Sequence, residues 1–141
     1  MNVIVRKAEF VKGSARPGTY PDWPLTEIAF AGRSNVGKSS ALEVLLQGRC
    51  KIRVSKTPGR TREINFFKTQ LECKAPSTAG ADRNIKELAL VDLPGYGYAK
   101  VPLWKRQDWG PLVDDYLENR ANLRGVVLLC DLRRGPEQEE Q

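Results

Sequence analysis

The stretch Gly32-Arg33-Ser34-Asn35-Val36-Gly37-Lys38-Ser39 fits the pattern G-x-x-x-x-G-K-S/T, which predicts a loop that wraps phosphate groups. A short apolar run, Ile28–Ala31, leads straight into this loop and reads as a buried strand. The residues that follow, Ser39–Gln47, have the spacing of an amphipathic helix, and Gly48 suits the position just past its end. Glycines allow the backbone to approach phosphates closely, and the helix would offer them its positive N-terminus.

Two side chains of this loop predict specific contacts. Lys38 is expected to reach the β- and γ-phosphates and so to act in catalysis, and the Ser39 hydroxyl is expected to bind Mg²⁺. The alternative is an ordinary strand-to-helix turn. We disfavour it because the full pattern seldom arises by chance in a chain of average composition.

A second motif, Asp92-Leu93-Pro94-Gly95, follows another apolar run, Leu88–Val91. In a P-loop protein, an aspartate at the end of such a strand holds Mg²⁺, usually through water. Gly95 can then give its backbone N–H to the γ-phosphate. Alone, such an aspartate is often only a turn residue, but the upstream loop makes it significant. An ATPase would more often show Asp-Glu here, so the Asp-x-x-Gly form favours GTP.

The segment between the two motifs, Cys50–Glu63, is polar and contains Pro58-Gly59, which predicts a mobile loop. A switch loop needs a hydroxyl that reaches Mg²⁺ and the γ-phosphate only in the triphosphate state. Thr61 is the candidate, and Thr57 is its rival. A threonine in a plain Pro-Gly turn is the alternative that spacing alone leaves open.

The remaining apolar segments predict the fold class. Ile64–Leu71 and Val126–Cys130 read as strands, and the region between carries one apolar helical stripe made of Trp109, Leu112, Val113, Tyr116 and Leu117. Pro111 fits best in the first turn of this helix, and otherwise it kinks the helix. Strands alternating with helices predict an α/β fold of the P-loop NTPase class, a three-layer sandwich whose mostly parallel sheet is covered on both faces.

Composition narrows the chemistry. The 141 residues contain no histidine, so any catalysis must rest on positioning and electrostatics, and the three cysteines show no metal-ligand spacing. No apolar run is long enough to cross a membrane, and no signal-peptide core is visible, which favours a cytosolic protein. The net charge is +6, and the segment 49–62 holds six basic residues and no acidic one. That segment is either a solvated loop or a contact for a polyanion.

Four segments together resemble the EngB family of Era-like bacterial GTPases: Gly32–Ser40, Ser55–Thr61, Ile64–Phe67 and Asp92–Lys100. The sequence Tyr-Gly-Tyr-Ala-Lys after the aspartate motif is the most specific part, and the resemblance covers nearly the whole chain. It implies GTP or GDP as ligand, Mg²⁺, and slow GTP hydrolysis. It also implies a ribosomal subunit and its RNA as partners, a role in ribosome assembly and normal septation, and a monomer in the bacterial cytoplasm.

The resemblance also implies residue roles. Thr61 becomes a Mg²⁺ ligand and a catalytic residue, and the nucleotide is lined by Gly59, Arg60, Thr61, Arg62 and Glu63. Asn35 matches an asparagine that helps to hold K⁺ in related GTPases. Tyr96 stands where Ras-like proteins carry the glutamine that orients water, which is why slow turnover is expected. Arg60 and Lys100 are candidates to contact either nucleotide or RNA.

The family pattern continues with an Asn/Thr-Lys-x-Asp motif that reads guanine, and this chain has none. We therefore expect a leader over 1–24, a truncated G domain over 25–136 with about four of six strands, and an acidic tail over 137–141. Val126–Cys130 should then form a bare sheet edge. Three alternatives remain: an ATPase of another family, an RNA-binding module with a vestigial nucleotide site, and a fragment that does not fold alone.

Overall fold

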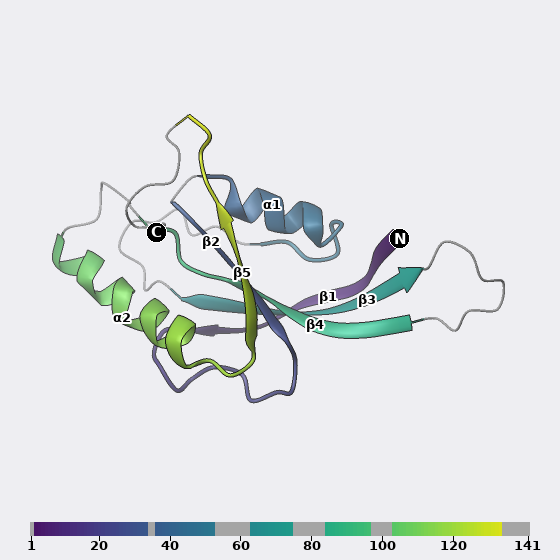
Figure 1. The fold of residues 1–141 in the computed structure, drawn as a ribbon, viewed down its shortest axis with the longest axis horizontal. Helices are drawn as coiled ribbons and strands as arrows, with labels where there is room; N and C mark the ends of the chain where they lie inside the picture. Colours follow the sequence, from purple (N-terminus) through teal and green to yellow (C-terminus); the bar gives the residue numbers. More distant parts are fainter. Residues whose placement is uncertain (1, 34–35, 53–62, 75–83, 97–102, 134–141) are drawn as a thin grey trace.

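A computed structural model describes residues 2–33, 36–52, 63–74, 84–96 and 103–133, with the backbone alone for 103–109. Within this part of the chain, five strands and two helices follow one another (Figure 1). They are β1 (Asn2–Ser14), β2 (Glu27–Gly32), α1 (Lys38–Leu45), β3 (Ile64–Lys74), β4 (Asn84–Asp92), α2 (Leu103–Asn119) and β5 (Leu123–Leu129).

The strands form one sheet in the order β1-β3-β4-β2-β5. Strand β2 is parallel to both β4 and β5, whereas β3 is antiparallel to both β1 and β4. The sheet is therefore mixed, which corrects the expectation of a mostly parallel one. The segment between β3 and β4 is too short for the crossover of about a dozen residues that a parallel pair requires, so these strands pair antiparallel.

Strand β1 lies in the segment predicted to be a leader, and it raises the strand count from about four to five. It pairs with β3 along its whole length, from Asn2 opposite Lys74 to Ser14 opposite Ile64. The register shifts at two places, so Arg6 and Val11 are extra residues at bulges. These bulges break the alternation of apolar and polar residues, which explains why the sequence pattern did not predict this strand.

The core has two parts, one on each face of the sheet. Neighbouring residues of a strand point to opposite faces, so Ala29 and Phe66 face α2 while Phe30 and Phe67 face α1. The two helices flank the sheet accordingly (Figure 1). The part under α2 comprises Ala29, Ile64, Phe66, Val91, Leu93, Leu112, Val113 and Tyr116. The part under α1 comprises Phe30, Leu42, Leu46, Ile52 and Phe67.

Helix α2 confirms most of the predicted stripe. Leu112, Val113 and Tyr116 are buried, whereas Leu117 is exposed and the side chain of Trp109 lies outside the described part. The helix begins at Leu103, so Pro111 lies inside it and not in its first turn. The residues that follow Pro111 are buried, and their packing keeps the chain helical after the proline.

A buried polar group, which we call the Glu27 cluster, ties α2 to the segment before β2. Glu27 is fully buried and accepts hydrogen bonds from Trp23 (2.8 Å), Tyr116 (2.9 Å) and Arg120 (2.7 Å). Arg120 also donates to the carbonyl oxygen of Pro21 at 2.7 Å. Burial raises the pKa of Tyr116, and the nearby Glu27 carboxylate raises it further. Hydrogen bonding to Glu27 raises the pKa of Arg120, so the guanidinium of Arg120 stays charged.

Strand β5 is an edge of the sheet, as predicted for the apolar run that it contains. Among the described residues it pairs with β2 alone. Val126, Val127 and Leu128 are 48%, 43% and 40% exposed, so much of their apolar surface faces solvent. No helix among the described residues is long and apolar enough to cross a membrane.

Candidate functional site

The two predicted motifs meet at one edge of the sheet. Strands β2 and β4 are parallel neighbours with Phe30 opposite Asp92, so both end at the same place. The N–H of Leu93 donates to the carbonyl oxygen of Phe30 at 3.1 Å, and the N–H of Tyr96 donates to that of Gly32 at 3.3 Å. Backbone bonds thus hold the aspartate loop against the start of the phosphate loop. Ligands commonly bind at such carboxyl ends of strands.

Two glycines of the loop are required for different reasons. Gly32 is buried, and a Cβ atom there would lie 2.8 Å from Cγ1 of Val36 and 3.0 Å from the carbonyl oxygen of Leu129. Gly37 has a φ of 97°, a left-handed conformation that side chains rarely adopt. Gly32 therefore allows Val36 and the backbone of Leu129 to approach closely, and Gly37 permits the turn into α1.

A substitution tests the close approach at Gly32. Gly32→Ala should destabilise the chain by about 1–3 kcal/mol and weaken phosphate binding, because Val36 and the backbone of Leu129 must move. Gly125→Ala is the matched control, since the nearest described atom to its Cβ would be Cδ1 of Ile28, at an ordinary 3.6 Å. Urea unfolding followed by circular dichroism measures both. Equal midpoints for the two variants would contradict this account of Gly32.

Helix α1 begins at Lys38, directly after the turn at Gly37. No side chain in the described part of the chain caps this end, and Ser39 lies in its first turn with a half-buried side chain. The first amides of a helix and its dipole together favour an anion at this position. The arrangement is therefore that of a phosphate-binding helix start.

Lys38 and Asp92 connect the two motifs directly. The ammonium group of Lys38 forms an ion pair with the carboxylate of Asp92, and both side chains are about nine-tenths buried. Burial raises the pKa of Asp92, and the charge of Lys38 opposes that rise. The site thus holds one cation and one anion out of bulk water, where each interacts more strongly with charge than at the surface.

The donor set suits Mg²⁺ held together with phosphate. The hydroxyl of Ser39 and the carboxylate of Asp92 are hard oxygen ligands, which Mg²⁺ prefers. No group of three acidic, cysteine or histidine side chains is gathered for a metal among the described residues. Mg²⁺ commonly takes one or two protein carboxylates and completes its shell with substrate phosphates and water. These residues therefore fit an ion that arrives with a nucleotide.

The structure brings together one part of the predicted site. Around the ends of β2 and β4 lie Gly32, Arg33, Val36, Gly37, Lys38, Ser39, Asp92, Leu93, Pro94 and Gly95. Outside the described residues lie Ser34, Asn35, Gly59, Arg60, Thr61 and Arg62. Leu93 is 1% exposed within the core under α2, so only its backbone is available to a ligand. Glu63 lies against Gly13 of β1, beyond β3 from the phosphate loop.

Tyr96 has a structural role that sequence reasoning missed. It is 7% exposed, and it forms a parallel bridge with Arg33 that extends the pairing of β2 with β4 past the strand ends. In the sequence, Tyr96 was marked only by its place in the Tyr-Gly-Tyr-Ala-Lys sequence and by its match to the glutamine position of Ras-like proteins. The burial of Tyr96 suits a residue that braces the aspartate loop. Because Tyr96 has no glutamine amide to orient water, slow turnover is also expected.

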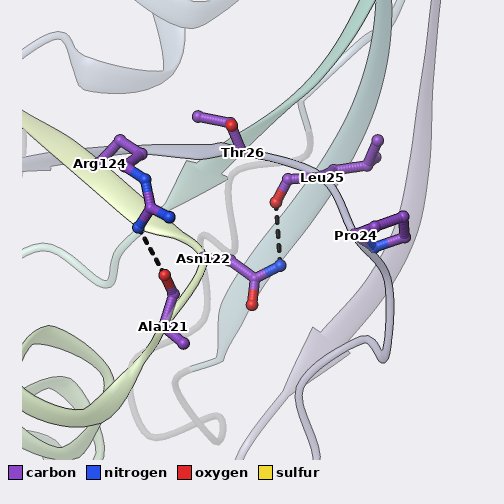
Figure 2. A pocket seen from close by; sticks show the side chains of 6 residues that line it. All are labelled: Pro24, Leu25, Thr26, Ala121, Asn122 and Arg124. Carbon is purple, nitrogen blue, oxygen red and sulfur yellow. Dashed lines mark hydrogen bonds between the residues drawn. The ribbon is translucent and has the colours of Figure 1, made fainter.

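A hollow of about 240 Å³ lies at the opposite end of the parallel strands and carries no such chemistry (Figure 2). It is lined by Pro24, Leu25, Thr26, Ala121, Asn122 and Arg124. The amide of Asn122 donates to the carbonyl oxygens of Trp23 and Leu25, and Arg124 donates to that of Ala121. These polar groups join the starts of β2 and β5, so the hollow belongs to the framework of the sheet.

Comparison with known proteins assigns the class. A family model described as "50S ribosome-binding GTPase" matches residues 27–141, which include both motifs. The chain therefore belongs to this family of P-loop GTPases, and the predicted fold class is confirmed.

Within that family the chain is similar to EngB proteins, which confirms the resemblance found in the sequence. It is 49% identical over 138 residues to the probable GTP-binding protein EngB of Geobacter sp. strain M21, covering 98% of this chain and 58% of that protein. The corresponding protein of Geobacter metallireducens is 50% identical over 137 residues, covering 97% of this chain and 60% of that protein. A crystal structure of a probable GTP-binding protein EngB matches with a TM-score of 0.46 and 30% identity, over 73% of this chain and 47% of the other. The chain thus spans about three-fifths of the length of these curated relatives.

Proposed function

We propose that this chain binds GDP and GTP together with Mg²⁺ and hydrolyses GTP slowly. One observation carries the proposal. Lys38, at the start of α1, contacts Asp92 at the end of the neighbouring parallel strand, and the glycine loop lies directly beside them. A cation, a carboxylate and a helix start at one sheet edge are the parts that bind a nucleoside triphosphate.

Each described residue has a proposed task. The backbone from Gly32 to Gly37 surrounds the phosphates, and Lys38 exchanges its contact with Asp92 for contacts to phosphate oxygens. Ser39 and Asp92 hold Mg²⁺, with Thr61 as a further ligand. When bound, Mg²⁺ neutralises charge that develops on the phosphates. Asn35 is proposed to hold K⁺, and Gly59, Arg60 and Arg62 to line the nucleotide.

The proposed biological role follows from the family. The matching family model is described as ribosome-binding, and the chain has a net charge of +6, which favours an RNA partner. We therefore include in the proposal a role in assembly of the large ribosomal subunit in the bacterial cytoplasm, with an effect on cell division. Co-sedimentation with large subunits that is absent at both low and high salt would contradict this role.

Titration of fluorescent GDP and ADP analogues into the chain with Mg²⁺ tests the nucleotide site. Saturable binding of GDP is the expected result, and preference for GDP over ADP would mean that guanine is recognised without the Asn/Thr-Lys-x-Asp motif. Equal weak binding of both nucleotides would contradict specificity for guanine and leave a general phosphate site. No binding of either by a chain with native circular dichroism would overturn the proposed function.

A further inference from the structure

Gln47 ends helix α1 in a backbone conformation that few side chains adopt. The N–H of Gln47 donates to the carbonyl oxygen of Val44 at 3.0 Å, and the N–H of Gly48 donates to that of Glu43 at 3.2 Å. In this common helix ending, the residue after the C-cap is left-handed and is usually glycine. Here that residue is Gln47, whose φ of 52° is the one positive φ of a non-glycine residue in the described part of the chain. A costly conformation kept without glycine indicates that the side chain has a task.

The side chain of Gln47 reaches the backbone of β1. Its Oε1 atom accepts a hydrogen bond from the N–H of Val5 at 3.0 Å, and its Nε2 atom donates to the carbonyl oxygen of Val3 at 3.2 Å. Groups two residues apart point to the same side of a strand. Strand β1 has β3 on one side only, and these two groups lie on the other. The end of α1 therefore lies beside the start of β1, at the outer edge of the sheet (Figure 1).

The two bonds reproduce those that a neighbouring parallel strand would make. In a parallel pair, one residue accepts from the N–H that follows its neighbour and donates to the carbonyl that precedes that neighbour. The amide of Gln47 makes this pair of bonds on the two sides of Ile4. The amide thus takes the place of one residue of an added strand.

The segment that Gln47 contacts is the part of β1 without other protection. From residue 6 onward, bulges at Arg6 and Val11 and several charged side chains interrupt the outer edge. Residues 2–5, Asn-Val-Ile-Val, carry no charged side chain and are rich in the β-branched residues that favour strands. A regular, uncharged edge of this kind readily accepts another strand.

We propose that Gln47 is an intramolecular cap on the outer edge of β1, and that this edge, once uncapped, binds β5 of a second copy of the chain. Strand β5 is the other edge of the described sheet, and Val126, Val127 and Leu128 expose apolar surface there. Two antiparallel pairings lead from β1 to β4 and two parallel pairings lead from β4 to β5, so β1 and β5 run parallel. A second copy that continues the sheet therefore presents β5 to β1 in the orientation that the Gln47 amide imitates.

Amide hydrogen exchange, measured by NMR at low protein concentration, tests the cap. Gln47→Gly should make the Val5 amide exchange about tenfold faster, because that N–H loses its acceptor. This variant should fold, since glycine favours the backbone conformation at this position. Gln47→Asn tolerates the same conformation but is one methylene shorter, so it should also release Val5. The amides of residues 42–45 in α1 should be unchanged in both variants.

Gln47→Glu is the matched control for the cap. It keeps the length of the side chain and an acceptor oxygen for the N–H of Val5, and it loses only the donor to Val3. The Val5 amide should therefore stay better protected than in the glycine variant.

Sedimentation velocity over a range of protein concentrations tests the partner strand. Gln47→Gly should associate at a concentration on the order of tenfold lower than the wild type does, because it offers a further pairing edge. Adding Val3→Lys should abolish this extra association, since Val3 is 44% exposed and a charge there discourages pairing. Adding Val127→Lys instead should have the same effect if β5 is the strand that binds. Circular dichroism checks that each variant is folded.

The cap is overturned if the Val5 amide exchanges equally fast in the wild type and in Gln47→Gly. It is also overturned if the amides of α1 accelerate together with that of Val5, because Gln47 would then be an anchor for the helix. The partner is overturned if Gln47→Gly associates no more than the wild type. It is equally overturned if Val127→Lys leaves the extra association intact, because another surface would then hold the second copy.

Discussion

Replacing Lys38 by alanine should lower the affinity for GDP by about a hundredfold. A charge-assisted hydrogen bond to phosphate contributes about 1.5–3 kcal/mol, and every 1.4 kcal/mol corresponds to roughly a tenfold change in affinity. The effect should lie near the upper end of this range because the Lys38 side chain is only 10% exposed. Titration with fluorescent GDP measures the loss directly.

Lys51→Ala is the matched control for this experiment. Lys51 is an exposed lysine of the basic segment 49–62 and lies outside the phosphate loop, so its removal should change GDP affinity by less than about threefold. Circular dichroism must show that the Lys38 variant is folded, because that variant leaves the buried Asp92 without its counter-charge. A folded Lys38→Ala chain that binds GDP as tightly as the Lys51→Ala chain would contradict the assigned role.

Replacing Glu27 by alanine should lower the free energy of unfolding by about 3–5 kcal/mol. The substitution leaves Arg120, whose side chain is 14% exposed, without its carboxylate, and removal of one partner of a buried ion pair has this cost. It also removes the acceptor for Tyr116 and Trp23. Since domains are stable by only about 5–15 kcal/mol, the midpoint of urea unfolding should fall steeply.

The pair Lys68–Glu87 supplies the comparison. Its charged atoms are 3.7 Å apart on side chains 36% and 40% exposed, so Glu87→Ala should cost less than about 1 kcal/mol. Glu27→Gln keeps the shape of the side chain and an acceptor oxygen, and its loss should fall between the two. The interpretation fails if Glu27→Ala and Glu87→Ala shift the urea midpoint equally.

Local sequence signals correctly predicted the strands and the helix that surround the candidate site. The predicted strands Ile28–Ala31 and Leu88–Val91 lie inside β2 and β4, and the helix expected over Ser39–Gln47 is α1 at Lys38–Leu45. A glycine loop between a buried strand and a helix is encoded within a few neighbouring residues, so one sequence suffices to find it. The position of Asp92 beside Lys38 agrees with the expectation that both motifs serve one Mg²⁺ and phosphate site.

Features that depend on distant residues were not predictable. The Glu27 cluster pairs residues 93 positions apart, and neither Glu27 nor Arg120 belongs to a motif. Strand β1 was missed because bulges at Arg6 and Val11 interrupt its alternation. Pro111 was placed in a first turn because propensity disfavours it elsewhere, and the packing of Leu112, Val113 and Tyr116 overrides that preference.

The two edges of the sheet differ in a way that limits how copies of the chain can assemble. On β1, the two bulges and the charged residues Arg6, Lys7 and Lys12 discourage a further strand from joining. On β5, the apolar side chains from Val126 to Leu128 offer no such protection. A fibre forms only if each molecule can pair through both edges of its sheet. A molecule with one such edge can only pair with the same edge of a second copy, across a two-fold axis. Association through strand edges would therefore stop at a closed pair.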